Sequence, residues 1–83
     1  MEEDKQLICD KMLELFQVTR HFYDLESLKY FYNWDKENKC HINEEFPVTE
    51  YVVATFNNGY KKYVNVSIDS GIAMIEDVLN GII

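Results

Sequence analysis

The sequence predicts a small α+β domain, in which an N-terminal and a C-terminal helix pack on a mainly antiparallel sheet of about three strands. Two observations support this prediction. Apolar residues recur at helical spacing near both ends of the 83-residue chain, and between them an Asn-Gly pair separates two strand-like runs. The chain has no internal repeat and no Gly/Ser-rich linker, so we expect residues 1–83 to form a single domain.

The first helix is expected from Glu3 to about Val18. Its apolar stripe consists of Ile8, Met12, Leu15 and Phe16, widened by Cys9 and Leu13. Polar and charged residues fill the opposite side: Lys5, Gln6, Asp10, Lys11, Glu14 and Gln17. We therefore expect an amphipathic helix with one face on the core and the other in solvent.

The segment 19–47 leaves two alternatives open. Alternation of Leu28, Tyr30, Tyr32 and Trp34 is typical of a strand, and the spacing of Leu25, Leu28, Phe31 and Tyr32 equally suits a short helix. Asp24 could cap that helix. The density of aromatic residues favours a strand that adds to the hairpin. A turn over 35–38, a short edge strand over 39–43 and a connection through Pro47 would follow.

A β-hairpin is expected from strands Thr49–Phe56 and Lys61–Ile68. Asn58-Gly59 suits a two-residue type I′ turn, whose two central residues both need positive φ. That turn would pair Val53 with Val64, Tyr51 with Val66 and Thr49 with Ile68, making their face the core face. The other face would be mixed: Val52, Ala54, Phe56 and Tyr63 beside Glu50, Lys61, Asn65 and Ser67. A one-residue change of register would exchange the two faces.

The second helix is expected from Gly71 to about Asn80, with Ser70 or Asp69 as its cap and Asn80-Gly81 as its stop. Its apolar face would consist of Ile72, Ile75, Val78, Leu79 and Ile82. The last residues, Ile82 and Ile83, would then fold back onto the core.

Charge is the clearest global property of the chain. Fifteen acidic residues against eight basic ones give a formal charge of −7, which opposes direct binding of DNA or RNA and attracts basic proteins. No apolar run approaches the roughly 20 residues that a membrane-spanning helix needs. Acidic residues at positions 2–4 replace the cationic start of a signal peptide, so we expect a cytoplasmic protein with free thiols.

Four residues are potential zinc ligands: Cys9, His21, Cys40 and His41. Structural zinc sites normally use paired ligands a few residues apart, whereas adjacent residues such as Cys40 and His41 on an extended segment point to opposite sides. The chain also lacks a glycine-rich phosphate loop and a nucleophile elbow. We therefore expect no metal, no cofactor and no enzymatic activity.

The aromatic run at residues 30–34 and the acidic clusters are the candidate interface. Tyr and Trp side chains are enriched at binding hot spots, although at least half of these rings would belong to the core. Acidic side chains on one face would mimic nucleic-acid phosphates, whereas an even distribution would only solvate the surface. The candidate partner-binding residues are Asp24, Glu26, Tyr30, Tyr32, Trp34, Asp35, Glu37, Glu44 and Glu45.

In size, acidity and order of elements, the chain resembles the small phage-encoded anti-CRISPR proteins. The matching features are the helix expected over 3–18, the Asn58-Gly59 hairpin, the helix expected over 71–80 and the acidic clusters. The resemblance implies a nuclease effector complex as partner and the host cytoplasm as location. The aromatic run departs from a pattern of pure charge mimicry.

Two function hypotheses follow. The first is a non-enzymatic inhibitor or modulator that uses an acidic surface against a basic, nucleic-acid-handling protein such as a CRISPR effector nuclease. The alternative is a homodimeric structural module, with the mixed hairpin face or an uncovered sheet edge as its interface. The sequence leaves open whether the protein is a monomer or a homodimer.

Overall fold

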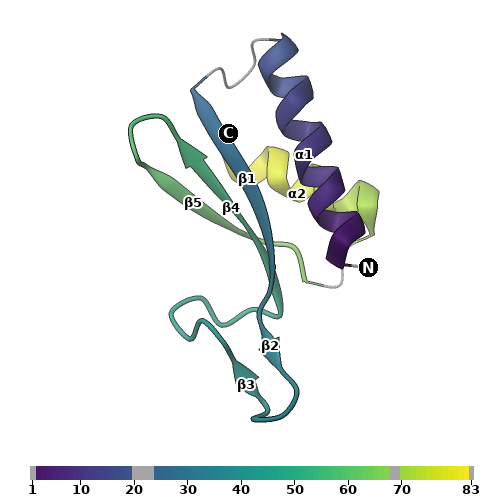
Figure 1. The fold of residues 1–83 in the computed structure, drawn as a ribbon, viewed down its shortest axis with the longest axis vertical. Coiled ribbons are helices and arrows are strands. Elements are labelled where there is room, and N and C mark those ends of the chain that lie inside the picture. The colour runs from purple at the N-terminus through teal and green to yellow at the C-terminus, as the bar shows by residue number, and fades with distance from the viewer. Residues whose placement is uncertain (1, 20–23, 68–69, 83) are drawn as a thin grey trace.

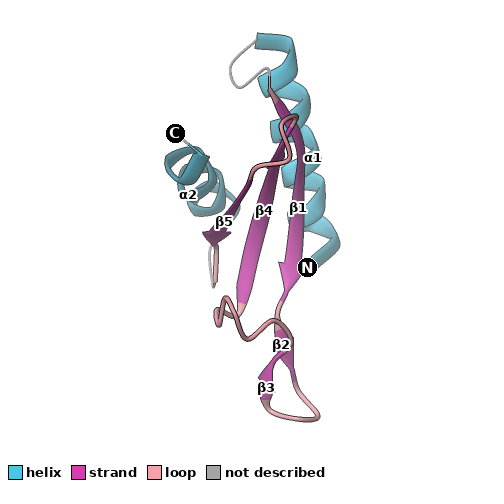
Figure 2. Cartoon of the chain, turned by 90° about the vertical axis from the view of Figure 1, so that its left-hand side faces the viewer, coloured by secondary structure: helices cyan, strands magenta, loops and turns pink. Residues whose placement is uncertain are grey.

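Two helices cover one face of a three-stranded antiparallel sheet (Figures 1 and 2). The computed structural model describes residues 2–19, 24–67 and 70–82 of the chain. The helices are α1 (Glu2–Thr19) and α2 (Gly71–Ile82). In the described parts of the chain, the opposite face of the sheet carries no helix. The predicted α+β class is therefore confirmed.

The main sheet has the strand order β1-β4-β5, so the strand β4 (Glu50–Phe56) lies at its centre. Its neighbours are β1 (Leu25–Tyr32) and β5 (Lys61–Asn65), both antiparallel to it. The segment that suited either a strand or a helix is thus a strand, and it adds to the hairpin as expected. β1 contains a bulge between Leu25 and Ser27, where its register against β4 shifts.

The predicted hairpin register is wrong by one residue. Val52, and not Val53, lies opposite Val64. The loop has three residues: the Gly59 amide donates to the Phe56 carbonyl and the Phe56 amide to the Tyr60 carbonyl, both at 2.8 Å. Among described residues only Lys39 and Gly59 have positive φ, so the turn is not type I′. It is a type I turn closed by a left-handed glycine, the usual three-residue hairpin loop.

The shifted register exchanges the two faces of β4, whereas Val64 and Val66 keep the core positions predicted for them. Val52, Ala54 and Phe56 of β4 are buried against the helices, together with Val64 and Val66. Tyr51 and Val53, predicted for the core, lie on the sheet face away from the helices. Position 68, predicted to pair with Thr49, lies outside the described residues.

The core between sheet and helices is closed by buried side chains from every main element. The helices contribute Cys9, Met12 and Phe16 from α1 and Met74, Val78 and Ile82 from α2. β1 contributes Leu25 and Leu28. α2 continues through the predicted stop at Asn80-Gly81, and Gly81 lies so close to β5 that a Cβ there would be 2.6 Å from Val64 Cγ2.

Ser70 caps α2 as expected. Its carbonyl accepts the Met74 amide at 2.9 Å, and its Oγ accepts the Ala73 amide at 3.4 Å. Asp69, the alternative cap, and Ile83, predicted to fold onto the core, lie outside the described residues. The start of α2 is therefore set by a short polar side chain, as is common for helices.

Two polar residues of α1, predicted to face solvent, instead contact the sheet. Lys5 pairs with the buried carboxylate of Glu50, which also accepts the hydroxyl of Tyr30. The Gln6 amide donates to the Leu28 carbonyl at 3.2 Å and accepts the Tyr30 amide at 2.8 Å. These contacts fix the N-terminal half of α1 along the outer edge of β1.

The chain beyond β1 forms a distal lobe, residues 33–49, at one end of the molecule (Figure 1). It contains the small hairpin of β2 (Trp34–Asp35) and β3 (Cys40–His41) and the loop that returns to β4. The prediction of a turn over 35–38 and a strand within 39–43 is confirmed by these two strands, although each has only two residues.

Asn33 organises the distal lobe. Its side chain is buried, and its Nδ2 donates to the carbonyls of Asn43, Phe46 and Val48 at 3.1, 3.1 and 2.9 Å. Its Oδ1 accepts the Asn43 amide at 2.7 Å. The side chain of Asn33 thus satisfies backbone groups of residues 43–48 that form no strand pairing with β1.

Candidate functional site

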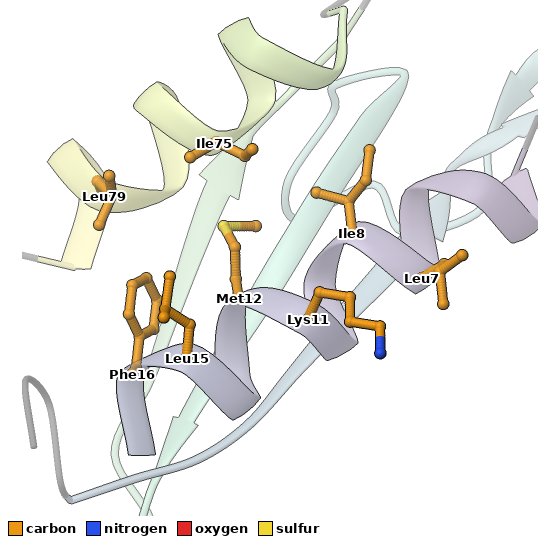
Figure 3. A pocket seen from close by; sticks show the side chains of 8 residues that line it. All are labelled: Leu7, Ile8, Lys11, Met12, Leu15, Phe16, Ile75 and Leu79. Carbon is orange, nitrogen blue, oxygen red and sulfur yellow. The ribbon is translucent and has the colours of Figure 1, made fainter. Parts of the chain in front are cut away.

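An apolar groove runs between α1 and α2 on the helical side of the molecule (Figure 3). It encloses about 400 Å³, and one wall is formed by α1 and the other by Ile75 and Leu79 of α2. The α1 wall consists of Leu7, Ile8, Lys11, Met12, Leu15 and Phe16. Figure 3 shows Met12 and Phe16 pointing from α1 toward α2, while the Lys11 amine extends away from α2.

The groove exists because the two helices carry more apolar surface than the sheet covers. Leu15, Ile72 and Ile75 were all predicted for core faces, yet they are 58%, 74% and 37% exposed. This part of the prediction is wrong. The sheet-facing positions are taken by Met12, Phe16 and Met74, and the predicted stripes extend sideways from these positions toward the gap between the helices.

Leu7 lines the groove and was not among the candidate residues predicted from the sequence. It is 55% exposed and begins a second apolar line along α1 with Leu15 and Val18, the latter 76% exposed. Residues 7, 15 and 18 fall on one side of a helix, displaced from the buried stripe. In the sequence, this surface is indicated by an apolar stripe on the first helix that is wider than one sheet can bury.

Carboxylates predominate on the exposed surface of the helices that form the groove. In the described parts of both helices, the exposed acidic side chains are Asp4, Asp10, Glu14, Glu76 and Asp77. Lys11 is exposed and lies 3.7 Å from Glu14, while Lys5 is turned inward to Glu50. The exposed surface of the two described helices therefore carries a net negative charge at neutral pH.

The structure does not bring the nine candidate interface residues together. Asp24 and Glu26 are exposed at the start of β1, where the Asp24 carbonyl accepts the Asn57 amide of the hairpin loop. The acidic residues Asp35, Glu37, Glu44 and Glu45 all lie in the distal lobe. The eight residues of β1 separate the two groups by about 26 Å.

Two of the three aromatic candidates, Tyr30 and Trp34, have internal contacts. Tyr30 is half-buried and donates its hydroxyl to Glu50. Tyr32 is half-buried at the end of β1, and the Trp34 ring meets His41 edge-on, with ring centroids 5.1 Å apart. Trp34 is thus the aromatic candidate that lies with the acidic group of the distal lobe.

The face of the sheet opposite the helices carries a second cluster of aromatic rings. Phe46, brought over from the distal lobe, lies 5.6 Å from both Tyr51 and Tyr63, and Phe31 stacks on Tyr51 at 5.2 Å. Val53 is buried on the same face and, with Phe31, Tyr51 and Tyr63, lines a shallow hollow there. This face is therefore largely covered by its own side chains, although Phe31 and Tyr63 remain 42% and 45% exposed.

The described residues offer no metal-binding arrangement. Across 2–19, 24–67 and 70–82, no group of three or more His, Cys, Asp or Glu side chains is placed to hold an ion, and His21 lies outside these ranges. Burial, and after it the nearby Asp10 charge, raise the pKa of the Cys9 thiol to about 12. Cys9 is thus an unreactive core residue, whereas Cys40 is partly exposed.

Neither described helix is long and apolar enough to span a bilayer. Comparison of the chain with protein-family models, with curated proteins and with solved structures found no match.

Proposed function

We propose that this protein is a non-enzymatic protein-binding module whose contact surface is the groove between α1 and α2. The observation that supports it is a contiguous apolar hollow of about 400 Å³ on a small, highly charged protein. Contiguous apolar patches on small domains commonly mark interaction sites, because leaving them in water is unfavourable. Grooves between helices are common docking sites for a partner's apolar side chains.

The proposal includes a finer hypothesis about the partner. The net charge of −7 favours a basic protein, and the resemblance to anti-CRISPR proteins suggests a nucleic-acid-handling one, such as a CRISPR effector nuclease, in the cytoplasm. Binding would then inhibit or modulate that partner by occluding its surface. A purified effector nuclease assayed with and without the protein tests the inhibitory part.

The test of the protein-binding proposal compares two variants with matched chemistry. The double variant Leu15→Ser, Ile75→Ser removes one apolar side chain from each wall of the groove. The control variant, Ile42→Ser, removes an apolar side chain that is 70% exposed on the distal lobe. Proteins captured from a lysate of the source organism are identified, purified and titrated against each variant by calorimetry. We expect the groove variant to lose binding and Ile42→Ser to keep it. Binding that survives the groove variant would refute the proposal.

The alternative, a homodimeric module, has one observation in its favour. Phe31 and Tyr63 expose aromatic surface on the sheet face away from the helices. A dimer through that face would be weakened by Phe31→Ser and unaffected by Leu15→Ser. Sedimentation velocity at micromolar concentrations distinguishes the two surfaces, and a strict monomer excludes this alternative.

A further inference from the structure

We propose that the occupant of the groove is a basic amphipathic helix supplied by a partner protein. This inference depends on the proposed function, because it names the class of partner for the same groove. It is supported by the shape of the groove, by the backbone of its walls and by the charges at its rim.

The dimensions of the groove match about two turns of a helix. Its α1 wall runs from Leu7 to Leu15, which is about 12 Å along the helix axis. Apolar side chains at positions i, i+4 and i+7 of a ligand helix span about 10.5 Å on one side, so three anchors fit between the walls. Ile75 and Leu79, one turn apart on α2, would contact those anchors from the opposite side (Figure 3).

The walls of the groove favour a helix over an extended segment. A bound strand gains affinity by pairing its backbone with a free strand edge. Both walls here are helices, whose interior amides and carbonyls already bond to one another. A ligand in the groove must therefore satisfy its own backbone groups, and a helix does so.

The described rim of the groove carries a net negative charge, from three carboxylates against the one lysine of the α1 wall, Lys11. Asp4 lies three and four residues before Leu7 and Ile8, which places it on their side of α1. Glu76 lies three residues before Leu79 on α2, and Glu14, beside Lys11, marks the outer rim of α1. Lys and Arg on the flanks of the ligand helix would meet these carboxylates.

The same charges oppose a second copy of this chain as the occupant. A two-fold dimer brings the same patch of each subunit face to face, so the rim carboxylates of Asp4, Glu14 and Glu76 in one copy would face the carboxylate-rich rim of the other. Each copy also carries a formal charge of −7, which adds repulsion at longer range.

The experiment uses three designed peptides of about 18 residues, a length that supports a helix. The first repeats leucines at i, i+4 and i+7 with lysines elsewhere on its surface. The second keeps the leucines and has glutamate in place of lysine, and the third has the composition of the first in scrambled order. Affinities for the full chain are measured by fluorescence anisotropy at low and high salt.

We expect the basic amphipathic peptide to bind about tenfold tighter than the acidic one at about 0.05 M salt. This preference should disappear near 1 M salt, where the Debye length falls to about 3 Å. The scrambled peptide should bind at least about tenfold more weakly than the basic one, since it presents no apolar face.

Matched variants separate the contribution of the rim charges to peptide binding from that of the apolar walls. Neutralising the rim by Asp4→Asn, Glu14→Gln and Glu76→Gln should abolish the preference for the basic peptide. The same change of charge in the distal lobe, made by Glu37→Gln, Glu44→Gln and Glu45→Gln, should leave it intact. Leu15→Ser with Ile75→Ser should abolish binding of the basic and acidic peptides alike, with circular dichroism confirming that each variant is folded.

The outcomes separate this inference from the proposed function. Equal affinity for basic and acidic peptides, or a dimer that Leu15→Ser dissociates, would overturn the inference. If neither peptide binds while capture of the natural partner still depends on the groove, the inference fails and the proposed function stands. If no groove variant alters binding of the peptides or of a captured protein, both fail.

Discussion

Replacing Asn33 by aspartate tests whether one buried side chain holds the distal lobe in place. The substitution keeps the size of the residue and the oxygen that accepts the Asn43 amide. It removes the amide donors that now bind three carbonyl oxygens within 3.1 Å and puts a second oxygen in their place. An ionised carboxylate there would face these three carbonyls in a site that is 2% exposed.

The expected loss of stability is large for a domain of this size. Unpaired buried carbonyls and a buried charge without a partner together cost about 3–5 kcal/mol. A typical stability of about 0.05–0.15 kcal/mol per residue gives about 4–12 kcal/mol for the whole domain. With roughly 4–8 °C of Tm per kcal/mol, Asn33→Asp should lower Tm by roughly 12 °C or more.

Urea unfolding at several pH values provides the assay. Burial raises the folded-state pKa of the introduced carboxyl above its unfolded value of about 3.9, so the deficit should be complete above the folded pKa and shrink as the pH falls toward the unfolded value. Asn58→Asp, on the exposed hairpin loop, keeps the acceptor for the Tyr60 amide and should change stability by less than about 0.5 kcal/mol. An Asn33→Asp stability within about 1 kcal/mol of wild type at neutral pH would refute this reasoning.

Three further predictions concern other parts of the chain. Gly81→Ala should destabilise the protein by about 1–3 kcal/mol in urea unfolding because its Cβ would meet Val64, and in a Val64→Ala background the same change should cost nothing. Ellman titration of the native protein should detect Cys40 and not the buried Cys9, and a Cys40→Ser variant should react only after unfolding. Hydrogen bonds from the Asn38 side chain, and after it from backbone amides, lower the pKa of Asp35 below its ordinary value of 3.8. The stabilisation of the turn by the Asp35 carboxylate should therefore be complete above pH 3.8 and be lost as the pH falls through the lower folded-state pKa. An NMR titration midpoint of Asp35 at or above 3.8 would contradict this.

Much of the secondary structure could be predicted because it depends on local patterns. The spacing of apolar residues over 2–19 suffices to indicate α1, and the aromatic alternation from Leu28 to Tyr32 indicates β1. The hairpin register could not be predicted in this way. Residues 51–54 of β4 are apolar on both faces, so only the loop length distinguishes the two registers. Asn57-Asn58-Gly59 suits a two-residue and a three-residue loop equally well.

The candidate site was harder to predict for a different reason. An apolar residue in a helix indicates burial, but the sequence does not say how wide a stripe the sheet can cover. Leu15 and Ile75 therefore read as core residues although they line an open groove. The acidic residues could be counted from the sequence, whereas the separation of Asp24 from Glu44 by the length of β1 depends on the tertiary fold.

The side chain of Gln6 occupies hydrogen-bonding groups on the outer edge of β1. Its amide offers one donor and one acceptor to Leu28 and Tyr30, the same pair of bonds that a fourth strand would offer. Strand addition by another chain is thereby directed to β5, a five-residue edge that begins with Lys61 and Lys62. A Gln6→Ala variant would free the Leu28 carbonyl and the Tyr30 amide on this edge, and we expect it to pair more readily with another chain as well as to lose stability.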